Sequence, residues 1–344
     1  MARMLPFALP LLLTLIFVFT ASFPYVFIIP LIIIAIGYLN KLIGKYNLNE
    51  LTRAYVFFHT DPRMAWFKSF NGLFFIGFNI WVIYFFAQYE FSFWHYCVVV
   101  YCIILINSNF AIALAHDLMH SAIWADRLLA KVLLLQNGFF YLEADHIYIH
   151  HRYVGTPKDP ATALLGEPVY LYFIRSVSAR LKFILFATDN IFPKKGKNII
   201  MFKTWLNIAL CGVYAYIVWA LGGLIAFICI ILQFFFVIMI YESITYIQHY
   251  GLQRNCKAGD LFDHVNLQHS WNCFYKLSSY LHFMMPVHSI HHLKDGKAED
   301  IKDFAGPSMP LPFAKMMLYA FIPFKWFRLM NARAELYNNM GRHI

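Results

Sequence analysis

Charged residues are scarce in this 344-residue sequence, and only 13% of the positions hold Asp, Glu, Lys or Arg. In soluble domains about a quarter of the residues are charged, so the composition argues against a cytosolic protein. Long polar tracts are also missing, and 60% of the residues are hydrophobic. A chain this apolar does not have the composition of a disordered protein. The sequence therefore indicates a protein that exposes much of its surface to lipid.

Cysteine is sparse as well, with six residues that fall mostly inside apolar stretches. No two of them form the CxxC pairs that are typical of zinc sites, and their spacing is not that of a small secreted disulfide-rich domain. We interpret these cysteines as reduced residues that pack among apolar side chains.

Apolar runs divide the sequence into six predicted membrane spans, since about 20 helical residues, or slightly fewer in a thin bilayer, cross a membrane. Pro24 is expected to break the first run into two helices. The predicted spans form three hairpins and cover residues 4–22, 24–38, 70–88, 93–115, 205–220 and 224–240. The expected fold is therefore an all-α integral membrane bundle.

Basic residues lie on one side of this predicted topology. Lys and Arg number five in residues 39–69, ten in residues 116–200 and eleven in residues 241–344, whereas the three turns on the opposite side contain none. The positive-inside preference predicts this segregation and places both termini on the cytoplasmic side. The net charge of +10 therefore indicates membrane orientation and anionic lipid, not nucleic acid.

Two polar lobes, residues 116–200 and 241–344, are expected on this positive side. No long linker separates either lobe from the spans. We therefore predict a single domain over residues 1–344.

Histidine is abundant, with 15 residues, and nine of them form four clusters in the two polar lobes or at their edges. The nine candidate metal ligands are His116, His120, His146, His150, His151, His249, His288, His291 and His292. We predict no role for His59, His95, His264, His282 or His343.

The spacing of these histidines predicts metal binding. Two rings four residues apart lie on one face of a helix, within reach of one ion. The pairs four residues apart are His116/His120 and His146/His150, and the pair His288/His291 is three apart. His151 directly follows the second pair, in position for a second ion, and His292 directly follows the third. A single HxxxH pair more often marks a helix surface, but four clusters on one side favour a metal site. Nine rings exceed the capacity of one ion, so we predict two.

The donor type favours iron. The clusters contain no cysteine, which argues against structural zinc. Imidazole suits iron, copper and zinc, and neutral ligands with open positions favour iron that reacts with dioxygen. Attack on an unactivated C–H bond requires a metal, because no side chain supplies that chemistry. We expect two non-haem iron ions, with zinc as the less favoured occupant, and no catalytic side chain beyond the metal centre.

These motifs resemble those of the membrane-bound alkane monooxygenases, within the membrane fatty-acid desaturase and hydroxylase superfamily. Residues 116–120 match the H-E-x-x-H box with Asp for Glu, and residues 145–151 match E-H-x-x-G-H-H, with a T-P-x-D-P-A-x-A tail at 156–163. Residues 245–252 match N-Y-x-E-H-Y-G-L, and residues 286–292 match Q-R-H-S-D-H-H. The resemblance implies a six-span bundle whose nine histidines hold two irons, with electrons from rubredoxin or another carrier.

Several positions depart from these family motifs, namely Ile149, Gln248, Pro286, Val287 and Ile290. Carboxylates beside metal-bound imidazoles orient the rings, and losing one typically costs 10–100-fold in affinity or activity. The residues that we expect to lie beside the ligands are Asp117, Asp145, Gln248 and His269. Of these, the two aspartates retain the charge that orients a ring.

The sequence thus predicts O2-dependent hydroxylation of a long hydrocarbon or a lipid acyl chain. Two alternatives stay open. A desaturase would use the same metals and remove a second hydrogen, and the choice depends on how the chain is positioned. A non-catalytic, lipid-contacting subunit of a larger membrane complex would explain the missing carboxylates at positions 248 and 290.

Overall fold

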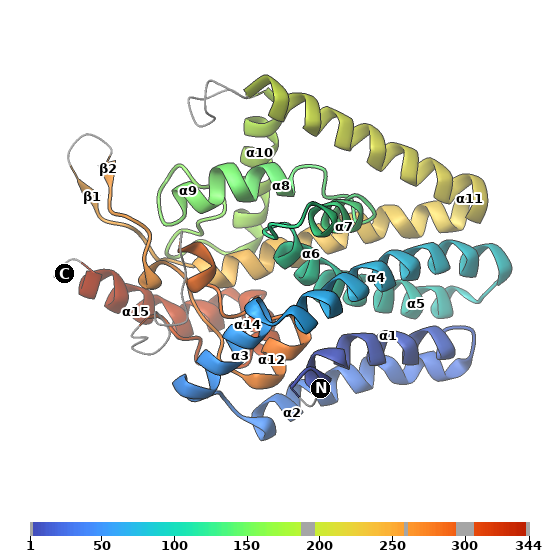
Figure 1. The fold of residues 1–344 in the computed structure, drawn as a ribbon, viewed down its shortest axis with the longest axis horizontal. Coiled ribbons are helices and arrows are strands. Elements are labelled where there is room, and N and C mark those ends of the chain that lie inside the picture. The colour runs from blue at the N-terminus through green and yellow to red at the C-terminus, as the bar shows by residue number, and fades with distance from the viewer. Residues whose placement is uncertain (1–2, 187–196, 258–260, 294–305, 342–344) are drawn as a thin grey trace.

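The computed structural model describes residues 3–186, 197–257, 261–293 and 306–341. Within these residues the protein is almost entirely helical (Figure 1), and its regular strands are β1 (Cys256–Lys257) and β2 (Leu261–Phe262), which pair in antiparallel orientation. The helices of the first part are α1 (Leu9–Thr20), α2 (Ile29–Ile43), α3 (Leu48–Thr60), α4 (Pro62–Gln88), α5 (Phe93–Ile106), α6 (Ile112–Leu118) and α7 (Trp124–Leu135).

The second part contributes α8 (Leu142–Asp145), α9 (His151–Tyr153), α10 (Val169–Phe186), α11 (Lys197–His249), α12 (Lys276–Leu281), α14 (Phe313–Ala320) and α15 (Pro323–Gly341). Two π-helical turns, Asn107–Ala111 and His146–His150, interrupt the regular helical geometry. Short 3₁₀ turns occur at Leu5–Ala8, Pro24–Ile28, Leu267–His269 and Ile290–His292.

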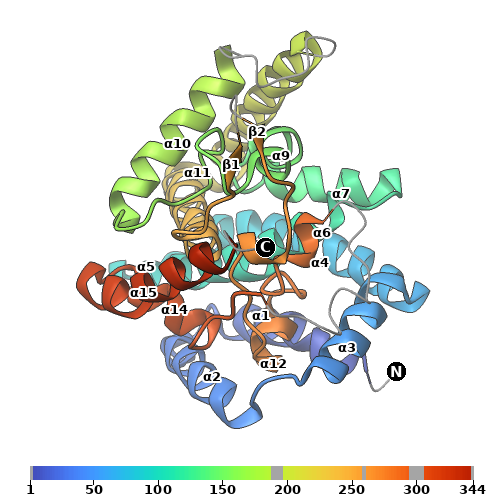
Figure 2. The same cartoon turned by 90° about the vertical axis from the view of Figure 1, so that its left-hand side faces the viewer.

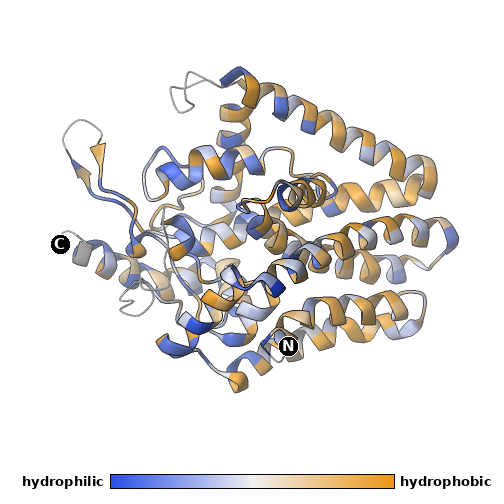
Figure 3. Ribbon diagram, viewed as in Figure 1, coloured by the Kyte–Doolittle hydropathy of each residue, from blue (hydrophilic) through white to orange (hydrophobic). Residues whose placement is uncertain are grey.

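Three helical hairpins form the apolar part of the molecule. In Figure 1 their turns lie at the same end, on the right, and Figure 3 shows that hydrophobic residues dominate these arms. The third hairpin is α11, which folds back at Gly223, where φ is 77°. Glycine tolerates this left-handed backbone, so the Gly222-Gly223 pair marks the turn. The three predicted hairpins are therefore present as helix pairs.

The helix lengths differ from the predicted spans. Among the residues that the structure describes, three helical stretches are long and apolar enough to cross a membrane, Pro62–Gln88, Phe93–Leu118 and the folded-back Lys197–His249. In the first hairpin, α1 has 12 residues and is shorter than the predicted span 4–22, whereas α2 has 15 residues and continues to Ile43, past the predicted end at residue 38. Each of these helices is preceded by a 3₁₀ turn that contains proline. The number of six spans and the orientation of the termini therefore stay predictions.

The starts and ends of the longer helices correct the predicted boundaries. Helix α4 begins at Pro62 and not at residue 70, because the Asp61 carboxylate accepts a hydrogen bond from the Arg63 backbone N–H and proline suits the first helical turn. Helix α11 extends past residue 240 to His249. Long helices thus carry the hairpins directly into the polar end of the molecule.

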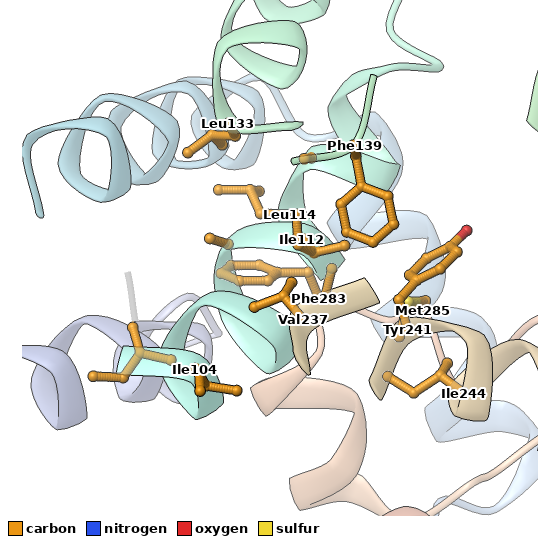
Figure 4. Packing of buried hydrophobic residues seen from close by; sticks show 14 of the residues in the cluster. Ile104, Ile112, Leu114, Leu133, Phe139, Val237, Tyr241, Ile244, Phe283 and Met285 are labelled. Carbon is orange, nitrogen blue, oxygen red and sulfur yellow. The ribbon is translucent and has the colours of Figure 1, made fainter. Parts of the chain in front are cut away.

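A continuous apolar core joins the hairpins to the polar end. In Figure 4, Ile112 and Leu114 of α6 lie near Val237 of α11 and near Phe283, and all four side chains are buried. Figure 2 looks onto the polar end, where α14, α15 and the β hairpin lie towards the viewer. This end contains the histidine clusters.

Candidate metal centre

Helices α5 and α6 bring the first two histidines together. A π-helical turn joins these helices, and His116 and His120 follow at the end of α6, with ring centroids 5.6 Å apart. The side chain of His116 is buried, whereas His120 is exposed. This pair has the predicted geometry of two rings that can share one ion.

The second cluster lies on a π-helical turn, and this changes which rings meet. A π turn contains more residues than an α turn, so residues four apart no longer lie directly above one another. The His146 ring faces His116 at a centroid distance of 4.5 Å, whereas the His150 ring faces His249 at 4.7 Å. The two rings that the α-helical spacing assigned to one ion therefore point to different neighbours.

The end of α11 and the segment 288–292 complete the centre. The Nε2 atom of His249 lies 3.0 Å from that of His288, which lies 2.9 Å from that of His292. The 3₁₀ turn Ile290–His292 sends His291 the other way, and its Nε2 atom lies 3.1 Å from that of His146. The predicted His288/His291 pairing on one ion is therefore wrong.

Eight of the nine rings form two groups in which the ligand nitrogens lie within 4.8 Å of one another. We call His116, His120, His146 and His291 the outer group, and His150, His249, His288 and His292 the inner group. His151 lies between them: its Nε2 atom is 3.0 Å from that of His146, and its ring centroid is 4.8 Å from that of His292. All nine predicted histidines thus converge at one place.

The two groups differ in exposure. Every ring of the inner group is buried, whereas His120 of the outer group is exposed and His291 is half-buried. Burial lowers the pKa of His151 to about 2 and keeps the pKa of His292 well below its usual range, with neighbouring imidazoles adding to the effect. These shifts favour the neutral form of His151 and His292, which is the form that binds a metal ion.

One carboxylate bonds directly to an inner-group ring. Asp159 Oδ2 lies 3.0 Å from His150 Nδ1 and also accepts a hydrogen bond from the Thr162 hydroxyl at 2.8 Å. Burial opposes the charge on Asp159, but the facing His150 imidazole holds the pKa of that carboxyl at about 2. The T-P-x-D-P tail contained this residue, but the sequence did not show that it reaches a ring.

The residues expected beside the ligands make other contacts. Asp117 forms an ion pair with Lys68 at 2.9 Å, and Asp145 forms one with Arg180 at 3.3 Å. The Gln248 amide donates to the Met285 carbonyl at 3.2 Å. His269 reaches a ligand through its backbone, since its carbonyl oxygen lies 3.4 Å from His249 Nδ1.

A buried charge network near the inner group was missed by the sequence analysis. Arg180 is 1% exposed and lies between the carboxylates of Asp145 and Glu242. Glu242 also accepts a hydrogen bond from the Ser176 hydroxyl at 3.0 Å. Glu242 is the one carboxylate in the long apolar helix α11, and a carboxylate in such a helix requires a buried partner. This feature of the sequence could have predicted the network.

A small cavity borders the histidines, and a larger one lies between the helices. A cavity of about 20 Å³ touches His116 and His291 of the outer group. An apolar cavity of about 120 Å³ lies between α1, α2 and α5 and has His282 in its wall. The segment after His282 lines the smaller cavity, and there Phe283 and Met284 adopt positive φ angles of 48° and 60°. Two consecutive residues other than glycine in this region are unusual and mark a strained wall.

The donor set fits two metal ions. All ligand atoms are imidazole nitrogens, which suit divalent transition metals, and cysteine is absent from both groups. The Nε2 atom of His288 lies 3.0 Å from that of His249 and 2.9 Å from that of His292, so three ring nitrogens converge at one point. The Nδ1 atoms of His288 and His292 are buried without a hydrogen-bond partner among the described residues. Nitrogens gathered in this way are satisfied best by a shared cation.

Comparison with known proteins agrees with this geometry. The chain is 28% identical to an alkane 1-monooxygenase of Acinetobacter baylyi over 308 residues, which cover 87% of this chain and 74% of the relative. It is 30% identical to alkane 1-monooxygenase 1 of Alcanivorax borkumensis over 66% of this chain and 57% of that protein. It is also 28% identical to the xylene/toluene monooxygenase hydroxylase component of Pseudomonas putida, over 63% of this chain and 58% of that protein.

The family comparison covers the centre itself. The sequence profile of the fatty acid desaturase family matches residues 91–298, more than half of the chain, and this range contains all nine histidines. This chain therefore belongs to the fatty acid desaturase family.

Proposed function

We propose that this protein is an integral-membrane oxidoreductase that uses dioxygen to hydroxylate a long hydrocarbon or a lipid acyl chain. The convergence of nine imidazoles, eight of them in two groups and His151 between the groups, carries this proposal. The similarity to alkane 1-monooxygenases favours hydroxylation over desaturation, since those relatives are named for oxygen insertion.

The nine histidines are proposed to hold two iron ions, and Asp159 and the His269 carbonyl orient two of the inner rings. Bound iron supplies the capacity to activate dioxygen toward a C–H bond, which side chains lack. The balance of the reaction is one oxygen atom into the C–H bond and one into water, with two electrons and two protons consumed. The electrons are proposed to come from rubredoxin or a related carrier.

The protein's own contribution is to position the chain and exclude water. The apolar cavity between α1, α2 and α5 suits an alkyl chain, because alkyl and aromatic side chains such as Ile32 and Phe17 dominate its lining. The strained wall at Phe283 and Met284 lines the small cavity beside the outer group and directly follows His282, which lines the apolar cavity. Movement of this wall would bring the chain to His116 and His291. We further propose one domain with six spans and both termini on the cytoplasmic side.

Elemental analysis of the purified protein tests the metal centre. We expect two irons per chain in the wild type and fewer than two in His249→Ala, which removes a buried inner ring. His264→Gln is the matched control, since His264 is exposed and lies outside both groups. Zinc in place of iron, or no metal, would favour a non-catalytic subunit of a membrane complex.

Product analysis tests the reaction. The iron-loaded protein, with a reductant and dioxygen, is expected to convert n-dodecane or a long-chain acyl lipid into a hydroxylated product. A new double bond without added oxygen would instead identify a desaturase. Label from ¹⁸O2 in the product separates the two results directly.

A further inference from the structure

A groove of about 400 Å³ lies away from the histidines, where three chain segments meet. These segments are the residues before α1, the connection from α2 into α3, and the start of α12. The groove is lined by Arg3, Pro6, Phe7, Tyr46, Glu50, Arg53, Ala54, Phe57, Lys276 and Tyr280. None of these residues belongs to the metal centre.

The groove carries an excess of positive charge. Lys276 Nζ lies 2.9 Å from Glu50 Oε2, so this cation and this carboxylate balance each other. Arg3 and Arg53 also line the groove, and neither forms an ion pair with another residue in the described part of the chain. The charge of Arg53 also acts on Glu50, so three cations face one carboxylate and the groove keeps a net positive charge. Guanidinium groups recognise phosphate through paired hydrogen bonds.

The base of the groove is apolar. Phe7 is 1% exposed and packs against Phe58 and Tyr280, with ring centroids 5.1 and 5.2 Å away. Tyr46 and Tyr280 add phenol groups to the lining, and Lys276 lies over the Tyr46 ring at 5.7 Å. The groove thus offers cationic rims above an aromatic floor, which suits an anion with an apolar part.

Two exposed leucines lie close in sequence to residues that line this groove. Leu5, two residues from Arg3, is 74% exposed, and Leu42, four residues from Tyr46, is 81% exposed. Figures 1 and 3 show this corner at the polar ends of the first hairpin, where hydrophobic and hydrophilic residues meet. Such large exposed leucines favour lipid contact. A soluble anion would not use them.

We propose that this groove binds the phosphate headgroup of an anionic membrane glycerophospholipid. Arg3 and Arg53 bind the phosphate, the aromatic floor contacts the glycerol region, and the acyl chains run over Leu5 and Leu42 along the first hairpin. Cations at the membrane boundary attract anionic lipids in this way. The site would anchor α1 and α2, two of the helices that line the apolar cavity.

Native mass spectrometry of the full chain, released from micelles that contain phosphatidylglycerol and phosphatidylcholine, tests this site. We expect retention of phosphatidylglycerol over phosphatidylcholine by the wild type. The double variant Arg3→Gln/Arg53→Gln is expected to retain about 30-fold less phosphatidylglycerol, because two cations near an anionic lipid are lost. Retention of phosphatidylcholine should not change.

Two further variants make the test specific. Glu50→Gln removes the one carboxylate of the groove and is expected to increase phosphatidylglycerol retention about fivefold. Gln still suits the capping position that Glu50 occupies at the start of α3. Arg328→Gln is the matched control, since Arg328 is an exposed arginine of α15 outside the groove, and it should leave retention unchanged.

Three outcomes would overturn the proposal. They are equal retention by the double variant and the wild type, an Arg328→Gln effect as large as that of the double variant, and displacement of the lipid by millimolar inorganic phosphate, which would identify a free-phosphate site. Retention needs neither iron nor turnover, so a failure here leaves the proposed oxidoreductase function untouched. The melting temperature of each variant shows that it is folded.

Discussion

The outer and inner groups of histidines have the same donor type but different surroundings. The inner group is buried on all sides and has the Asp159 carboxylate and the His269 carbonyl behind two of its rings. The outer group reaches the surface at His120 and borders the small cavity beside Phe283. No carboxylate bonds to its rings among the described residues.

This difference predicts that the two groups hold their ions with different affinity and different access to small molecules. A site with buried, oriented rings is preorganised and exchanges its ion slowly. A site with an exposed ring and an adjacent cavity gives access to small molecules. We therefore expect the inner ion to be retained tightly and the outer ion to meet dioxygen and the substrate chain first. The following predictions test this comparison.

Loss of Arg180 is expected to have the largest effect, since it leaves the Asp145 and Glu242 carboxylates buried without a cation. Breaking a buried ion pair from one side typically costs about 3–5 kcal/mol. Chemical unfolding of Arg180→Met in detergent micelles should show this loss, together with loss of the inner iron. Arg63→Met, which breaks an exposed pair with Asp61, should barely change the unfolding midpoint. Equal effects would refute the structural importance of the buried network.

Chelation should separate the two groups in time. The outer ion is reached through exposed His120, whereas release of the inner ion requires local opening of the fold. Iron released to an excess of chelator is expected in two equal phases whose rates differ by about 100-fold or more. Release in a single phase would show that the groups do not differ in accessibility.

Substitution of Asp159 should weaken only the inner site. Asp159→Asn keeps the size of the side chain but removes the charge that faces His150, so the affinity for the inner ion should fall about 10–100-fold. Asp117→Asn is the matched control, because Asp117 pairs with Lys68 and bonds to none of the nine rings among the described contacts. Titration with a competing metal indicator measures both. A larger loss of metal affinity in Asp117→Asn than in Asp159→Asn would contradict the proposed role of Asp159.

Lowering the pH is expected to destabilise the metal-free protein gradually. Burial lowers the pKa values of His151 and His292 in the folded state, so the unfolded chain takes up more protons below its ordinary histidine pKa. Stability is therefore full above about pH 6.5 and falls by up to about 1.4 kcal/mol per buried ring for each pH unit below it. Melting temperatures from pH 7.5 to 5.5 measure this slope. His151→Gln should make it shallower; an unchanged slope would contradict the assignment.

The sequence predicted the architecture better than the lengths of its elements. Apolar runs and the glycine pair at residues 222–223 located the hairpin turns, because these signals are local. Hydropathy did not locate the ends of α4 and α11, since helices continue past the apolar part when caps and tertiary contacts allow it. It also overestimated the length of α1, where a 3₁₀ turn that contains proline occupies part of the apolar run, and it placed the end of α2 too early.

The nine histidines were found from spacing, but their partition was not. Spacing rules assume a regular α-helix, and the π turn at His146–His150 and the 3₁₀ turn at Ile290–His292 both violate this assumption. The contacts of the carboxylates were harder to predict. Asp117 and Asp145 are next to candidate ligands in the sequence, but they form ion pairs with Lys68 and Arg180. Asp159 reaches His150 from nine residues away by a turn that the sequence does not reveal.

The π turn at His146–His150 also limits how this centre can be copied. A designer who writes the same HxxxHH letters onto an ideal α-helix would stack the first two imidazoles over a single ion, because 3.6 residues per turn aligns them. In this protein one widened turn directs two histidines of a continuous peptide into two different histidine groups. Deleting one residue between His146 and His150 would therefore change which rings face one another, although every histidine would still be present in the sequence.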